Sequence, residues 1–112
     1  MKVPHLTRAL LLEASERVPD GAGGFSESWA ALGTLWAEVV AGAGRDPAGE
    51  EVTLSSVGYR ITVRAAPPGD GMRPKPGQRF REGSREFPIL AVAERDAAGR
   101  FLTCHCREEA PR

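Results

Sequence analysis

Alternation of apolar and polar residues is the strongest local pattern in the chain, and it predicts β-strands. In residues 59–64 the odd positions are apolar, whereas the even positions are Arg60, Thr62 and Arg64. A strand places successive side chains on opposite faces, so this segment is expected to have one face in a core and the other outside.

The first apolar segment, residues 6–18, is compatible with two structures. Its composition favours a helix, but Leu10, Leu12 and Ala14 also alternate as in a strand. The turn-forming residues 19–24 follow directly, and an alternating segment containing Phe25 and Trp29 comes next. We therefore expect a β-hairpin, with glycines supplying the positive φ values of its turn.

The remaining chain reads as short strands separated by turns. Strands are expected over residues 35–40, 77–82, 87–92 and 101–106, the third with Phe87, Ile89 and Ala91 on one face. Asp46-Pro47 resembles a helix start and predicts a short helix or turn over 47–56. The proline-rich residues 65–76 predict an exposed loop. The expected fold is mainly β: a small six-stranded antiparallel barrel or sandwich with one short helix or long loop excursion.

Length and charge limit the range of functions. The 112 residues suffice for one domain, residues 1–112, and its 15 basic and 15 acidic side chains cancel. Residues 1–56 carry four basic and eight acidic side chains, and residues 57–112 carry eleven and seven. Bulk positive charge therefore gives no reason to expect nucleic-acid binding, whereas two oppositely charged halves suit self-association or stacking on a charged partner.

The sequence contains no apolar run of the roughly 20 residues that a membrane-spanning helix needs, and no cleavable leader pattern. No membrane association is expected. Cys104 and Cys106 stand two apart on a predicted strand, so they share a face and are expected to be buried free thiols, compatible with a reducing compartment.

Residues capable of catalysis or metal binding are few. The only histidines are His5 and His105, and a strand would turn His105 away from its two cysteine neighbours, so we expect no metal site. The sequence has no nucleophile elbow, phosphate-binding loop or zinc-protease motif. We predict neither enzymatic activity nor a cofactor.

A basic cluster lies in the second half of the chain, interleaved with acidic residues and few aromatics. Its members are Arg73, Lys75, Arg79, Arg81 and Arg85. This composition favours a solvated or interface-forming surface over base stacking, and leaves non-specific contact with DNA open.

Several short motifs, in this order, resemble those of one known family. They are Gly23-Gly24-Phe25 with Trp29, Leu35 to Val39, Gly44-Arg45-Asp46, Tyr59 to Arg64, Pro76 to Phe80 with Gly83, Phe87, Ile89 and Val92, and Asp96, Gly99, Arg100 to Thr103 and Cys106. Over about residues 7–109 the chain resembles the small head-tail joining proteins, also called head closure or stopper proteins, of tailed bacteriophages and gene transfer agents.

The resemblance implies a non-catalytic virion protein in the neck of a phage or gene transfer agent particle, assembled in the bacterial cytoplasm. Its partners would be copies of itself in a ring of six or twelve, the head adaptor or portal complex, the tail terminator or first tail ring, and packaged DNA in the lumen. The excursion over residues 42–58 would face the channel. The candidate gate residues are Arg45, Asp46, Glu50, Glu51 and Thr53, whose acidic members would repel DNA phosphates.

The predicted partner interface consists of basic residues. These are Arg60, Arg64, Arg73, Lys75, Arg79, Arg81 and Arg85, which would meet acidic surfaces of neighbouring subunits or of the adaptor. The alternative function is a small β-barrel binding module for nucleic acid or peptide, unrelated to virions. Such a module should display several aromatics on one exposed face, whereas most aromatics here occupy positions that alternate like a core.

Overall fold

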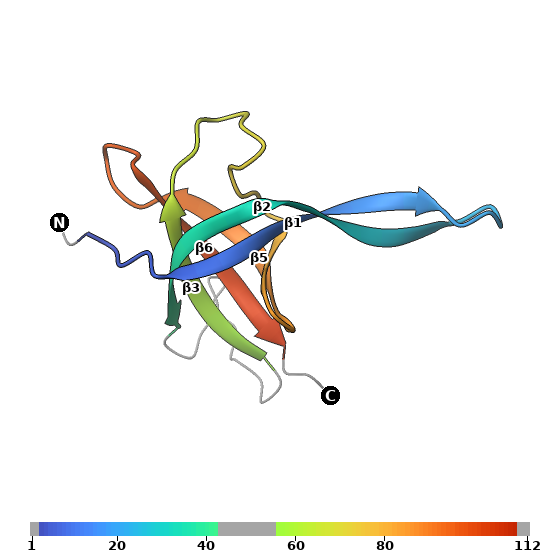
Figure 1. Ribbon diagram of the computed structural model, residues 1–112, viewed down its shortest axis with the longest axis horizontal. Coiled ribbons are helices and arrows are strands. Elements are labelled where there is room, and N and C mark those ends of the chain that lie inside the picture. The colour runs from blue at the N-terminus through green and yellow to red at the C-terminus, as the bar shows by residue number, and fades with distance from the viewer. Residues whose placement is uncertain (1–2, 43–55, 110–112) are drawn as a thin grey trace.

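The computed structural model describes residues 3–42 and 56–109, which form a closed antiparallel barrel (Figure 1). Its six strands follow one another around the barrel in the order β1-β2-β3-β6-β5-β4. Their bounds are β1 (Arg8–Pro19), β2 (Phe25–Ala41), β3 (Ser56–Arg64), β4 (Arg79–Glu82), β5 (Arg85–Glu94) and β6 (Phe101–Glu109). The predicted mainly-β fold of six antiparallel strands is confirmed, while residues 47–55 of the predicted short helix lie outside the described residues.

The barrel interior is filled by the apolar faces of all six strands. Its fully buried members include Leu10, Leu12, Ile61, Val63, Phe80, Phe87, Leu102, Cys104 and Cys106. Tyr59 packs its ring edge-on against Phe87, with the ring centres 5.3 Å apart. The alternation predicted for residues 59–64 is confirmed for the inward face, where Ile61 and Val63 are buried. On the other face Arg60 and Arg64 are exposed, whereas Thr62 is only 5% exposed.

Two bulges interrupt the regular pairing of the strands. Opposite Leu12 and Glu13 of β1, the pairing skips Leu32, so the extra residue of this bulge lies on β2. Glu13 therefore keeps the outward face of β1, where Arg79 and Arg81 cover its carboxylate. A second shift lies between Ile89 and Ala91 of β5. There the expected inward position of Ala91 is wrong, because Val92 packs against the core instead.

The first hairpin extends far beyond the barrel. The two segments expected as separate strands, containing Phe25 and Leu35, form the single strand β2 of 17 residues, which pairs with the 12-residue β1. Residues 14–31 of this hairpin, called the arm below, project along the longest axis of a molecule that measures 53 × 35 × 25 Å (Figure 1). The predicted glycine turn is confirmed, with φ values of 80° at Gly21 and 86° at Gly23.

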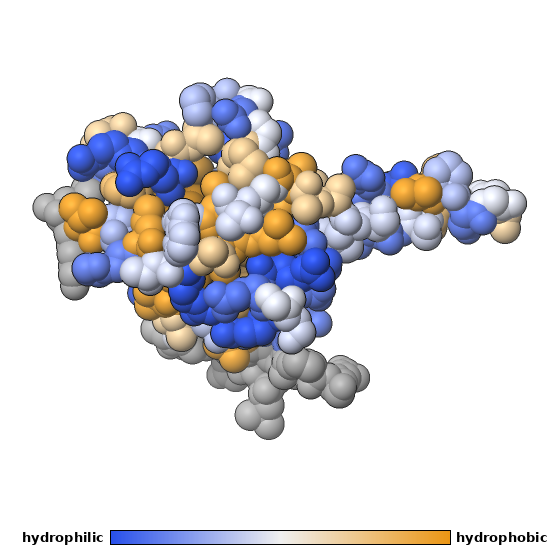
Figure 2. Space-filling view, in the orientation of Figure 1, coloured by the Kyte–Doolittle hydropathy of each residue, from blue (hydrophilic) through white to orange (hydrophobic). Residues whose placement is uncertain are grey.

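Two aromatic residues are more exposed than their alternating positions predicted. Trp36 on the barrel is 60% exposed and Phe25 near the end of the arm is 59% exposed. Trp36 points outward because its neighbours Leu35 and Ala37 supply the inward face of β2. The arm surface is otherwise largely hydrophilic, with one hydrophobic patch towards its end (Figure 2).

Candidate interaction surfaces

The arm is fixed to the barrel by a charged cluster at its root. The Arg79 Nε donates to Glu13 Oε1 at 2.7 Å, and Arg81 Nη2 lies 3.3 Å from Glu13 Oε2. The Arg79 Nη1 lies 3.2 Å from Glu86 Oε2. The guanidinium carbon of Arg79 lies 4.0 Å from the centre of the Trp29 ring. Because Glu13 comes from β1, Trp29 from β2, Arg79 from β4 and Glu86 from β5, the cluster joins four strands where the arm leaves the barrel.

A second ion pair joins β5 to β6 at another place on the barrel. Arg85 donates through Nε and Nη2 to both carboxylate oxygens of Glu108, at 2.7 and 2.9 Å, and through Nη2 to the hydroxyl of Tyr59. Its guanidinium also lies 4.9 Å from the Phe87 ring centre. These hydrogen bonds hold the pKa of the Glu108 carboxyl below its usual range.

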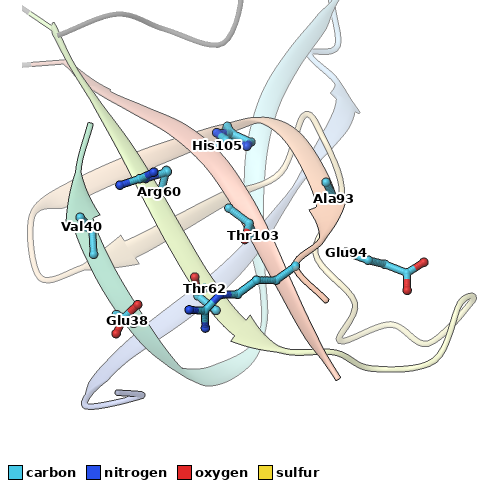
Figure 3. Close-up of a pocket in the computed structure, with 9 residues that line it drawn as sticks. Glu38, Val40, Arg60, Thr62, Ala93, Glu94, Thr103 and His105 are labelled. Atoms are coloured by element: carbon cyan, nitrogen blue, oxygen red, sulfur yellow. The ribbon is translucent and has the colours of Figure 1, made fainter. Parts of the chain in front are cut away.

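The outer face of the barrel carries an open groove of about 450 Å³ (Figure 3). Its floor is a grid of cross-strand pairs, in which Arg60 of β3 lies opposite His105 of β6, and Thr62 lies opposite Thr103. On the third strand, β2, Val40 lies opposite Arg60 and Glu38 lies opposite Thr62. Basic and acidic side chains are mixed along the groove, which also includes Arg95 and Glu94 from the end of β5. Such a shallow, mixed-charge surface suits contact with another protein.

The seven predicted interface residues fall into two groups. Arg79, Arg81 and Arg85 are engaged in the ion pairs described above, so they contribute to the barrel and the root of the arm. Arg60, Arg64 and Lys75 are exposed, and Arg73 donates to the carbonyl of Ala66 at 2.7 Å. The sequence pattern could not separate the groups, because Glu13, the partner of Arg79 and Arg81, lies more than sixty residues away, and Glu108, the partner of Arg85, lies on the next strand.

The gate residues proposed from the sequence, Arg45, Asp46, Glu50, Glu51 and Thr53, lie outside the described residues. The sequence reasoning missed the arm itself, since it treated β2 as two strands. It also missed Glu13, for which the only available signal was an acidic residue directly after three leucines.

The cysteines behave as predicted. Cys104 and Cys106 are free, buried side by side in the barrel interior, and His105 points to the outer groove. Burial raises the pKa of the Cys104 thiol to about 12 and raises that of Cys106 as well. Among residues 3–42 and 56–109, no three His, Cys, Asp or Glu side chains gather as metal ligands, and no helix is long and apolar enough to cross a membrane.

The aromatic side chains do not form a platform on the barrel. All seven lie in the described segments, and those classed as exposed, Trp36 and Phe25, belong to the barrel and to the arm respectively. Tyr59, Phe80 and Phe87 pack in or against the core. This distribution gives no support to the alternative of a base-stacking module.

Comparison with known proteins identifies the chain's relatives. A family model described as phage head completion protein matches residues 1–109. A chain in the structure of the virion of a native gene transfer agent particle is 58% identical, with a TM-score of 0.81 over 96% of this chain and 98% of that one. A Shigella flexneri 2a protein known from its solution structure shares the fold, at 22% identity and a TM-score of 0.67 over the full length of both chains.

No curated protein matched the chain. The family match covers nearly every residue, including all six strands and the arm. The chain therefore belongs to the phage head completion protein family, and with it to the structural proteins of the virion.

Proposed function

We propose that the chain is a connector subunit that assembles into a ring at the head-tail interface, closes the DNA-filled head and provides the platform for tail attachment. The observation that carries this proposal is the 58% identity, over almost the whole length of both chains, with a chain of a gene transfer agent virion. The fold is consistent with it, because a small barrel with a long projecting arm offers a large surface for neighbours and few groups for chemistry.

Assembly would also compensate for the chain's small size. A barrel of this length buries a limited fraction of its surface, and contacts with neighbouring subunits add burial that the monomer lacks. The proposed ring partners are further copies of the chain, with the head adaptor on one side and the first tail component on the other.

Four exposed or half-buried basic residues are proposed to meet acidic surfaces of these partners. They are Arg60, Arg64, Arg73 and Lys75. Arg79, Arg81 and Arg85 are excluded from this test, because reversing their charge would break ion pairs within the subunit. Arg60→Glu and Lys75→Glu should leave the purified subunit folded and reduce the yield of tailed particles.

The acidic residues of the segment before β3 are proposed to form an electrostatic gate for DNA. Replacing Asp46, Glu50 and Glu51 together by Asn or Gln removes three negative charges from each subunit. We expect fewer heads to retain DNA in particles with this variant than in particles with the unchanged chain, as measured by counting filled and empty heads. Unchanged retention in particles that contain the variant would remove the electrostatic role.

Deletion of the gene tests the main proposal. Cells without it should accumulate heads that lack tails, and the wild-type copy supplied in trans should restore joined particles, as counted in negative-stain images. Normal numbers of filled heads joined to tails in the deletion strain would refute the connector assignment.

A further inference from the structure

The arm carries the longest open backbone edges in the part of the chain that the structure describes. β1 pairs with β4 only over Leu11–Glu13, and β2 pairs with β3 only over Ala37–Ala41. Beyond these ladders the two arm strands pair only with each other. Residues 14–19 on one side and 25–36 on the other therefore have a free edge.

The register of the hairpin shows which backbone groups point to these edges. The Asp20 amide donates to the Gly24 carbonyl at 3.1 Å, so this pair faces inward. Antiparallel pairs alternate between inward and outward hydrogen-bonding groups. Arg17 and Glu27, which lie directly opposite each other, thus direct their amide and carbonyl groups outward. Ser15 and Trp29 form the next outward pair.

Such edges are suited to strand addition. An isolated two-stranded ribbon is only marginally stable in water, and this one is anchored by packing only at its root. Natural proteins protect exposed edges with charged side chains, especially lysines, and with prolines or bulges. The arm has no lysine, its bulge lies at the root and its proline, Pro19, stands at the outer end of β1. The charged side chains of its strands, Glu16, Arg17 and Glu27, are of both signs, so they favour an edge of matching charge pattern instead of repelling every partner. Extended backbone is the partner that this geometry fits.

The charges favour a second copy of the same arm as that partner. Inside one hairpin, Arg17 lies opposite Glu27. Suppose that β1 of the next copy adds to β2 with the same residue pairing as inside the hairpin. Glu27 then has an Arg17 on each side, one from its own copy and one from the next, so positive and negative charges alternate across the sheet. Opposite charges on facing strands stabilise a sheet, and no like charges become neighbours in this row.

We propose that the β1 edge of each arm pairs antiparallel with the β2 edge of the next copy, so that the arms form one continuous sheet around the ring. This inference rests on the ring assembly of the proposed function. The two edges differ, so the contact is head-to-tail, which is the kind of interface that closes into rings.

Cysteine cross-linking tests the pairing directly. Between copies, Val18 of one arm would face Ser26 of the next in a pair without hydrogen bonds, where Cα atoms are about 4.5 Å apart and a disulfide fits. Val18 is 41% exposed, whereas the native Cys104 and Cys106 are buried and unreactive, so introduced thiols are the only accessible ones in the described segments.

Single variants Val18→Cys and Ser26→Cys are co-expressed in equal amounts, and particles are purified and mildly oxidised. Each chain has one new thiol, so only dimers form. About a quarter of interfaces then combine the two variants in the right order, which links up to about half of the chains. The matched control is a mixture of the single variants Ser84→Cys and Ser26→Cys. Ser84 is exposed on the turn between β4 and β5, away from the arm, so this mixture should give no dimers.

The outcomes separate the two proposals. Reducible dimers in the Val18/Ser26 mixture alone support the continuous sheet. Particles that contain the chain but give no dimers overturn the arm pairing and leave the connector role intact. Absence of the chain from purified particles refutes the connector role and the arm pairing with it.

Discussion

Replacing Glu13 by glutamine tests whether the charged cluster at the root holds the arm to the barrel. The Glu13 side chain is 5% exposed and bonded to Arg79, which is 15% exposed, while Arg81 is 42% exposed. Glutamine keeps the size and one acceptor oxygen but removes the charge. Arg79 is then left with Glu86 as its carboxylate partner, at 3.2 Å.

The expected loss follows from the burial of each contact. A hydrogen bond to a charged group contributes about 1.5–3 kcal/mol, and the more exposed contact to Arg81 adds less than about 1 kcal/mol. Because glutamine still accepts one hydrogen bond, part of this contribution is kept, and we expect Glu13→Gln to lower the free energy of unfolding by about 1–2 kcal/mol. For a domain of this size, that corresponds to a fall in Tm of about 4–10 °C.

Denaturant unfolding followed by tryptophan fluorescence measures the loss, and hydrogen exchange locates it. Amides of the arm should exchange faster in the variant, while those of β6 change less. The matched control is Glu16→Gln, an exposed carboxylate on the same strand, which should stay within about 0.5 kcal/mol of the parent. A Glu13→Gln variant as stable as this control would refute the role given to the cluster.

Three further predictions follow from the barrel. Cys104 and Cys106 should resist alkylation at pH 8 until the chain unfolds, because their pKa values are raised by burial; fast labelling of the folded protein would contradict the buried placement. Arg85→Gln should cost about 1 kcal/mol at pH 7. Because Arg85 lowers the pKa of Glu108, that stabilisation is present above the ordinary carboxyl pKa of 4.5 and disappears as the pH falls through the lowered value, so urea midpoints of parent and variant should converge in acid. Trp36→Ser should change stability by less than about 0.5 kcal/mol in thermal melts, since the ring is 60% exposed, and a larger loss would mean that the ring packs on the barrel.

The sequence was informative wherever a regular alternation continued without interruption. Residues 59–64 gave the correct inward face, and Leu10 and Leu12 revealed a strand where composition favoured a helix. The pattern failed at irregular positions. The bulge after Ile89 brings Val92 rather than Ala91 to the core, and no local signal marks a bulge in this segment.

Long-range contacts were the other limit of sequence reasoning. Arg79 and Arg85 look like surface residues in the sequence. Closure of the barrel, which pairs β4 with β1, brings Glu13 to Arg79, whereas the pairing of β5 with β6 brings Glu108 to Arg85. The length of the arm was equally hidden, because the alternating segment with Phe25 and Trp29 and the apolar run over residues 35–40 were interpreted as two strands. In the structure this stretch is the continuous middle of β2. Interaction surfaces built from distant strands therefore leave no local pattern in the sequence.

Image reconstruction of the particle neck is the most direct test of the connector role. We expect a ring of these barrels between the head and the tail, with the arms directed to neighbouring copies. Density for the chain elsewhere in the particle, or a neck ring built without it, would refute the connector role.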